Sequence, residues 1–262
     1  MGNPVGADEQ LRVFLSLLPH DIAGREKLCA ALAEQGRFEE ALEECRALKE
    51  SMPHFAKPYY TMAYALARMG RLEESIEVYE SLLTVDPGAT IEIHNEIGRI
   101  QLHADRPELA IETYRKGIDD AADHGRGPAP DLHYNYAFAL KRIGRTEEAA
   151  SVFRRAAEIY GEIWRENPES IAPLLASGNA LIECGDPDEA SLRFREAAKL
   201  DPADVAGHLG LVRALDLAGR HDEAAAAARV GVQALEAGGR GDAATALRGR
   251  IAGRQPESAP GH

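Results

Sequence analysis

The sequence predicts an all-α fold built from a repeated pair of short amphipathic helices. The clearest pair spans 131–153, where a Gly-Arg-x-Glu-Glu-Ala turn at 144–149 joins the two helices. Variants of this turn recur at 36–41, 70–75, 105–110, 185–190 and 219–224, and the last residues of the six turns are separated by 34, 35, 39, 41 and 34 residues. This spacing indicates a structural repeat. Alanine and leucine are abundant, and no sustained alternation of polar and apolar residues indicates strands.

Two terminal segments flank the repeats. The N-terminal segment, 1–21, is expected to hold a helix at about 8–18, with Leu11, Phe14 and Leu18 on one face and Pro19 at its end. It corresponds to the second helix of an incomplete repeat, so one apolar side would be uncovered. We interpret it as either a modified cap or a contact surface. At the other end, 239–254 is expected to form a capping helix, and 255–262 is expected to be disordered.

Six repeats are expected between these segments. Each consists of a first helix, a tight turn, a second helix and a terminating stretch that often contains proline. The predicted boundaries are 22–55, 56–90, 91–129, 130–170, 171–204 and 205–238.

Irregular features surround repeat four. The stretch 121–130 is rich in glycine and proline and is expected to form a loop. The second helix of repeat four is expected to continue to about Glu166, and it carries Trp164 as either an internal packing anchor or an exposed binding residue. In repeat three, Asp105 replaces the turn glycine, so a local change in superhelix pitch is expected there.

Charge and cysteine content limit the classes of partner. The net charge is −13, whereas nucleic-acid binding relies on clustered Lys and Arg, so no nucleic-acid partner is expected. No signal peptide or membrane-spanning run is recognisable. Cys29, Cys45 and Cys184 have no zinc-site or disulfide-framework spacing. Cys29 and Cys45 are expected to lie close together and to stay reduced. These features favour a cytoplasmic protein that does not contact membranes.

The pattern within each unit resembles the tetratricopeptide repeat. Members of this family carry a small residue in the first helix, glycine at the turn, alanine five residues later, an aromatic residue four further on, and Asp-Pro before the next unit. The resemblance covers roughly 22–238 and implies a right-handed α-solenoid of about six helix-turn-helix units with N- and C-terminal capping helices. The matching residues are Ala63, Gly70, Ser75, Tyr79 and Pro87 in repeat two, and Gly178, Gly185, Ala190, Phe194 and Pro202 in repeat five.

The resemblance also implies a concave groove, lined mainly by the first helices, that binds a protein or peptide segment. Positions two, five, six, nine, twelve and thirteen of each first helix face this groove in the family. Here they hold aromatic, amide and cationic side chains, which suit apolar side chains, peptide backbone and carboxylates. The candidate groove residues are Tyr60, Thr61, Tyr64, Arg68, Asn95, Arg99, His103, Tyr134, Asn135, Phe138, Lys141, Arg142 and Asn179. The competing interpretation is that the aromatic residues only pack against neighbouring helices.

Patterns for more specific functions are missing from the sequence. The clamp by which some members of the family hold chaperone tails needs cations where Ala172 and Ala176 stand. His94 and His103 lack zinc-ligand spacing, and there is no nucleophile elbow, phosphate loop or dinucleotide motif. We therefore expect no enzymatic activity, metal or cofactor. The paired glutamates that open second helices are interpreted as solvated helix starts that favour the helix dipole.

The resulting functional hypothesis is a non-enzymatic scaffold or adaptor that binds a peptide segment of a partner in its groove. Two alternatives stay open. The chain could be a self-assembling structural scaffold, in which the N-terminal half-repeat or the Trp164 region packs against another copy. It could also be an accessory or regulatory subunit of an enzyme system such as a transferase.

Overall fold

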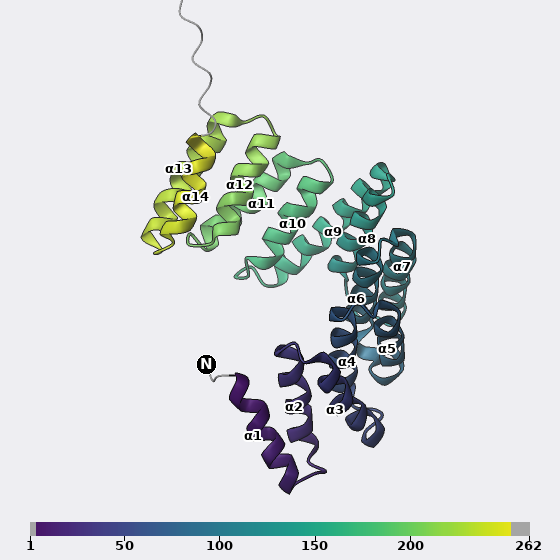
Figure 1. The fold of residues 1–262 in the computed structure, drawn as a ribbon. Helices are drawn as coiled ribbons and strands as arrows, with labels where there is room; N and C mark the ends of the chain where they lie inside the picture. Colours follow the sequence, from purple (N-terminus) through teal and green to yellow (C-terminus); the bar gives the residue numbers. More distant parts are fainter. Residues whose placement is uncertain (1–3, 253–262) are drawn as a thin grey trace, which may run out of the picture. The chain divides into compact units, whose positions relative to one another are not determined.

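The structure, a computed structural model, describes residues 4–252, and these residues form helices and turns without any strand (Figure 1). The chain divides into two compact units, Met1–Gly127 and Pro128–His262. The all-helical prediction is therefore confirmed. The tail 255–262, expected to be disordered, lies outside the described residues.

The first unit is a stack of consecutive helices, each packed against the next. The initial helix starts earlier than expected, because 4–7 are already helical. Three helix pairs, α2–α3, α4–α5 and α6–α7, correspond to the predicted repeats one to three, except that α6 begins at Thr90, one residue before the predicted start of repeat three. The helices are α1 (Pro4–Leu17), α2 (Ile22–Glu34), α3 (Phe38–Ser51), α4 (Ala56–Arg68), α5 (Leu72–Val85), the short 3-10 helix η1 (Pro87–Ala89), α6 (Thr90–His103) and α7 (Pro107–Asp123).

The second unit continues the same arrangement. Its long helix ends at Glu166, as predicted, and its last helix buries Ala244 and Leu247 against the unit. The helices are α8 (Pro130–Arg142), α9 (Thr146–Glu166), α10 (Ala172–Glu183), α11 (Pro187–Leu200), α12 (Val205–Leu217), α13 (His221–Ala237) and α14 (Gly241–Ala252). We call α2, α4, α6, α8, α10 and α12 the first helices and α3, α5, α7, α9, α11 and α13 the second helices. The exact limits of the repeats stay a prediction, since helix boundaries alone do not define them.

The recurring turn joins each first helix to its second helix through one left-handed residue. Gly70 has φ of 78°, and the next residue, Arg71, donates its N–H to Leu66 O at 2.9 Å, which closes the end of α4. In repeat three, Asp105 takes this conformation with φ of 58°, and Arg106 N bonds Gln101 O at 2.9 Å. Aspartate is among the few residues that tolerate this region. Asp105 therefore preserves the turn geometry without a glycine.

The arginine of the turn sequence directly precedes the second helix and binds the acid three residues later. Arg37 contacts Glu40 through two hydrogen bonds of 2.7 and 2.6 Å, and Arg220 contacts Glu223 through two of 2.7 Å. The same pairs form at 71 and 74 and at 145 and 148. The glutamates are thus helix starts, as predicted, and one acid of each pair is also an ion-pair partner of the turn arginine.

Aromatic side chains fill the spaces where first and second helices meet. Phe194 on α11 is 1% exposed, and its ring lies against the backbone of two first helices. A Cβ atom added at Gly178 on α10 would come within 2.7 Å of this ring, and one added at Gly210 on α12 within 2.3 Å. Tyr114 on α7 packs in the same way on Gly98 of α6. Small residues of the first helices and aromatic residues of the second helices therefore interlock at these contacts.

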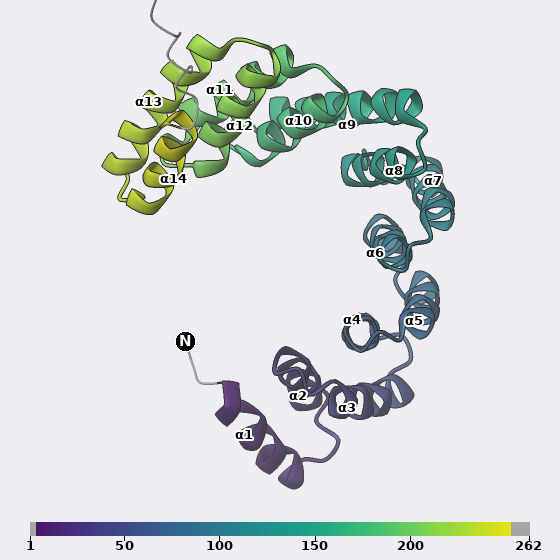
Figure 2. The ribbon, with the colours of Figure 1, turned by 45° about the horizontal axis from the view of Figure 1, so that its top comes forward.

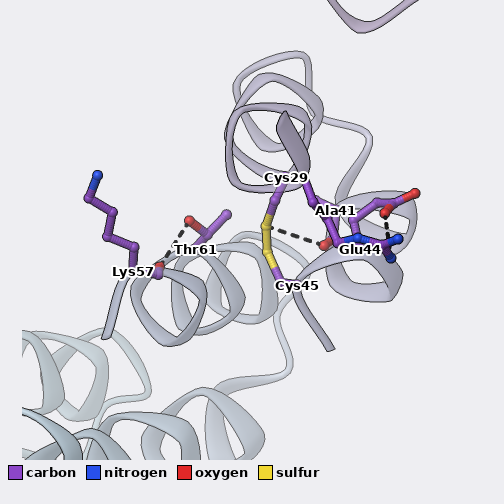
Figure 3. Close-up of a disulfide and its surroundings, with 7 residues drawn as sticks. Cys29, Ala41, Glu44, Cys45, Lys57 and Thr61 are labelled. Carbon is purple, nitrogen blue, oxygen red and sulfur yellow. Dashed lines mark hydrogen bonds and ion pairs between the residues drawn. A yellow bond between two sulfur atoms is a disulfide. The ribbon is translucent and has the colours of Figure 1, made fainter. Parts of the chain in front are cut away.

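The cysteine prediction is half right. Cys29 on α2 and Cys45 on α3 lie together in the core, with their Cα atoms 5.7 Å apart (Figure 3). The prediction that they stay reduced is wrong, because their sulfur atoms form a disulfide that links the two helices of repeat one. The sequence separation gave no sign of this bond, since it requires the two helices to place both thiols face to face.

Candidate functional site

The first helices lie on the inner side of each unit. In the first unit α2 packs directly on α4, and in the second α10 packs on α12. Within the described residues, the corresponding pairs of second helices make less extensive contacts. Elements on the inner side of a curved stack approach each other more closely than those outside. Figure 2 shows this for the first unit, where α4 and α6 lie inside the curve and α5 lies outside. We call the exposed side chains of the first helices the inner face of that unit.

On α4, one aromatic candidate is packed and another is open. Tyr60 is half-buried, with its ring 6.5 Å from that of Tyr79 in an edge-on contact. Burial, and then the charges of Asp86 and Glu92, raises the pKa of Tyr60. Tyr64 is 43% exposed. The packing interpretation therefore fits Tyr60, whereas Tyr64 remains available to a partner.

Tyr64 belongs to a small cluster with a cation. Arg68 Nη1 donates to Tyr64 Oη at 2.8 Å, and its guanidinium lies 5.6 Å from the ring centroid of Phe38 and 5.7 Å from that of Tyr64. Phe38 comes from α3, so the cluster joins neighbouring repeats. A guanidinium held over two rings is positioned for a carboxylate with little further loss of side-chain freedom. Thr61, in contrast, uses its hydroxyl on Lys57 O, at 3.3 Å.

On α6 the candidate residues are polar. Arg99 and His103 are exposed, and Asn95 is half-buried. Arg99 Nη1 pairs with Glu96 Oε1 at 2.7 Å on the same helix. This face of the first unit therefore offers both hydrogen-bond donors and acceptors.

In the second unit, α8 repeats the pattern of α4. Tyr134 is half-buried, with its ring 5.1 Å from that of Phe153, while Phe138 is 44% exposed. Asn135 is half-buried, and Arg142 is exposed, as is Asn179 on α10. All thirteen predicted side chains thus lie on first helices, and none of them is buried. Whether a partner binds them stays a prediction.

Two further charged side chains, Glu183 and Arg213, lie beside Lys141 on the inner face of the second unit. Lys141 Nζ on α8 contacts Glu183 Oε2 on α10 at 2.7 Å, and Arg213 Nη2 on α12 lies 3.7 Å from Glu183 Oε1. Leu217 follows Arg213 by one turn and is 57% exposed. Of these residues, only Lys141 was predicted. Extending the same family positions into repeats five and six would have found Glu183, Arg213 and Leu217.

The charges of Glu183 and Arg213 also influence the pKa of Tyr134. Burial raises the pKa of its phenol, the negative charge of Glu183 raises it further, and the positive charge of Arg213 opposes both effects. The hydroxyl of Tyr134 therefore lies in the electric field of the charged pair. The inner face of this unit therefore carries aromatic rings, one carboxylate and the two cations that contact it.

Two cavities of the described residues are lined by side chains other than these thirteen candidates. One of about 350 Å³ opens to the surface between α11, α12 and α13 and is lined by Leu211, Ala226, Ala227 and Val230 among others. Another of about 580 Å³ lies between α1 and α2 beside Leu11 and Phe14. In the described part of the chain, no group of three or more His, Cys, Asp or Glu side chains is placed to hold a metal ion. No helix found there has both the length and the apolar character to cross a bilayer.

Stacked helix pairs with exposed side chains along their first helices define a helical-repeat protein. Sequence comparison then identifies the repeat. Models of the tetratricopeptide repeat match residues 32–95, 130–162 and 175–238, together more than half of the chain. The chain belongs to the tetratricopeptide repeat family.

Solved structures agree in fold. BtubC (BKLC) from P. vanneervenii is 19% identical with a TM-score of 0.56, covering 88% of this chain and 96% of its own. A tetratricopeptide repeat protein from Parabacteroides merdae is 15% identical with a TM-score of 0.54, covering 95% and 92%. Pseudomonas aeruginosa pilF is 15% identical with a TM-score of 0.53, covering 87% and 97%. A comparison with curated proteins found no match.

Proposed function

We propose that the protein is an interaction scaffold whose inner faces bind a peptide segment of a partner protein. Family membership supports protein interaction as the general role. The observation that carries the proposal is the exposure of Tyr64 and Phe138, at 43% and 44%, each on a first helix that also carries cations. Large aromatic side chains that remain open to solvent beside charged groups are typical binding anchors.

The proposal is tested by partner capture with matched variants of the full chain. Tyr64→Ala and Phe138→Ala each remove an inner-face ring, one in each unit. Truncating an anchor of this kind typically weakens binding by about 1 to 2 kcal/mol, or roughly 5- to 30-fold. We expect one specific partner to be depleted from the capture by at least one of the two variants, as measured by quantitative mass spectrometry.

The controls remove apolar side chains of similar exposure from second helices. Leu109 on α7 is 46% exposed and Leu192 on α11 is 57% exposed. Leu109→Ala and Leu192→Ala should leave capture unchanged. Loss of the partner with these controls, or its retention by both inner-face variants, would contradict binding at the inner faces. If the captured partner is an enzyme, the result favours the accessory-subunit alternative, and the same measurement identifies that enzyme.

Self-association through α1 is a second candidate. Val13 and Leu17 on this helix are 64% and 76% exposed, and a cavity of about 580 Å³ lies beside Leu11 and Phe14. A second copy could cover this apolar side. The Trp164 region is less suited, because the indole is half-buried and its Nε1 atom is enclosed. Sedimentation equilibrium should show a dimer that Leu17→Glu dissociates, and a monomer at the highest attainable concentration would exclude this candidate.

A further inference from the structure

We propose that the inner face of the second unit recognises a peptide segment carrying a carboxylate between apolar side chains, and that Glu183 holds the carboxylate position in the unbound protein. This inference rests on the proposed peptide-binding function and specifies the chemistry of the segment. It assigns roles to Lys141, Glu183 and Arg213 that general family membership does not provide.

The geometry places one carboxylate between two cations from successive first helices. Lys141 of α8 and Arg213 of α12 both approach Glu183 of α10, at 2.7 and 3.7 Å. The side chains of the two cations are 50% and 51% exposed, whereas that of Glu183 is 21% exposed. The acid thus lies deeper than the cations that flank it. An incoming carboxylate can reach both cations from solvent without moving a helix.

The contact of Arg213 with Glu183 leaves binding capacity unused. A separation of 3.7 Å is longer than a hydrogen bond, so this is an ion pair without a short N–H···O contact. Guanidinium groups bind carboxylates best through two parallel hydrogen bonds. A ligand carboxylate can adopt that geometry, whereas Glu183, fixed at the end of α10, holds Arg213 only at a distance.

Exchange of one carboxylate for another costs little at an exposed site. Ion pairs between exposed side chains contribute little to stability, because water and salt screen them. Lys141 can therefore leave Glu183 for a ligand when the ligand gains other contacts. Glu183 acts as an internal competitor that keeps the two cations in place before binding.

Apolar side chains lie beside both cations and define what should flank the ligand carboxylate. Phe138 precedes Lys141 by three residues on α8, and Leu217 follows Arg213 by four on α12, so each lies on the same helix face as its cation. Their exposed fractions are 44% and 57%. A segment that places its acid at the cations can bury apolar side chains on Phe138 and Leu217.

The overall charge makes such a local site selective. The chain carries a net charge of −13, so an acidic segment is repelled over most of the surface. Attraction arises only where cations exceed acids, as at Lys141 and Arg213 around the single Glu183. The field of this group reaches the half-buried phenol of Tyr134 as well, since both Glu183 and Arg213 influence its pKa.

The test measures binding of three fluorescein-labelled peptide pools to the full-length protein by fluorescence polarisation. All pools consist of short peptides with blocked ends and leucine or phenylalanine at flanking positions. The central residues are Glu or Asp in the acidic pool, Gln or Asn in the neutral pool, and Lys in the basic pool. We expect the acidic pool to bind tightest, by about fivefold or more over the neutral pool, as for charge-assisted contacts. Added salt should reduce this preference.

Substitutions then separate the roles of the three residues. Glu183→Gln should tighten binding of the acidic pool by about two- to fivefold, because the Glu183 carboxylate no longer competes with the ligand carboxylate for Lys141 and Arg213, and a surface ion pair is worth about that much. Lys141→Met and Arg213→Met should each abolish the preference for the acidic pool. Glu158→Gln and Lys199→Met serve as controls, because they remove ion pairs of 3.1 and 3.2 Å on α9 and α11, away from the inner face.

The outcomes distinguish this inference from the general function. Equal binding of the acidic and neutral pools, with both weakened by Phe138→Ala, would overturn the carboxylate preference and leave the peptide-binding face intact. Identical behaviour of Glu183→Gln and Glu158→Gln would overturn the role of Glu183. Binding by no pool, or binding insensitive to Phe138→Ala, would contradict peptide binding at this face altogether.

Discussion

At the scale of single residues, the packing of the repeats depends on aromatic rings placed against glycine. The family pattern marks Gly178 and Phe194 as the small and aromatic residues of repeat five. It did not predict that the same ring also lies against Gly210 of the following first helix, within 2.3 Å of where a Cβ atom would be. That contact joins two repeats, so the residue spacing within one repeat could not predict it.

Two glycine substitutions in the second unit should have opposite effects on stability. Gly178→Ala places a methyl group 2.7 Å from a Phe194 ring that Gly210 prevents from moving away. We expect a loss of about 1 to 3 kcal/mol in the free energy of unfolding, as for other overpacked sites. Gly161→Ala on α9 meets no atom within 4 Å and should stabilise the helix by about 0.5 to 1 kcal/mol. Urea denaturation measures both, and a similar change in the two variants would contradict the packing described.

Buried tyrosines should make the fold sensitive to alkaline pH. Burial raises the pKa of Tyr79 to about 12, from a usual value of 10. Because the folded-state pKa is the higher one, the stabilising contribution is complete below pH 10 and is lost as the pH rises towards 12, at about 1.4 kcal/mol per pH unit. Tyr79→Phe should reduce this loss in urea titrations between pH 9 and 11. Tyr64→Phe, which alters an exposed phenol, should not.

At the scale of elements, the sequence predicted which segments form helices but not which side chains cap them. The turn arginines at 37, 71, 145 and 220 stand at N-cap positions and make no side-chain capping bond. Helix α11 differs, because Asp186 accepts a hydrogen bond from Glu189 N at 3.2 Å and another from Arg154 of α9 at 3.0 Å. The bond between Arg154 and Asp186 joins two repeats, so it depends on how the repeats stack and could not be predicted from the sequence of one repeat.

Substitution of Asp186 should separate capping from ion pairing. Asp186→Ala removes both and should lower the free energy of unfolding by about 1 to 2 kcal/mol, whereas Asp186→Asn keeps the cap and should lower it by about 1 kcal/mol or less.

Hydrogen bonds from Arg154 and from Glu189 N lower the pKa of Asp186. The stabilisation by its charged form is therefore present above pH 3.8 and is lost as the pH falls through the lowered value. Denaturation at pH 7 and pH 3 should show the difference between wild type and Asp186→Asn shrinking in acid, and a constant difference would contradict the ion pair.

The disulfide of repeat one gives a further test at this scale. Ellman titration of the unfolded, unreduced protein should detect one thiol, that of Cys184, and three thiols would contradict the bond. The bond closes a loop of 16 residues, so its reduction should lower the stability of the first unit by about 3 kcal/mol. Cys184→Ser provides the control, because it leaves the bond intact.

At the scale of the whole molecule, the sequence predicted the repeat family and the positions of its irregular segments. The glycine- and proline-rich stretch begins later than expected, since α7 continues to Asp123, and it contains the division between the two units at Gly127. That division was not predicted, because the repeat period runs across it. The inner-face positions were predicted from family register; all thirteen side chains lie on first helices, and five of them are half-buried rather than exposed. The grouping of Lys141, Glu183 and Arg213 was not predicted, because it arises only when the three helices that carry these residues are stacked.

Binding of partner segments along the first helices can be followed by hydrogen exchange of the full-length protein, read out by mass spectrometry with and without a saturating concentration of the acidic peptide pool. We expect slower exchange in α8, α10 and α12, with α9, α11 and α13 unchanged. Slower exchange confined to second helices or to α1 would contradict it.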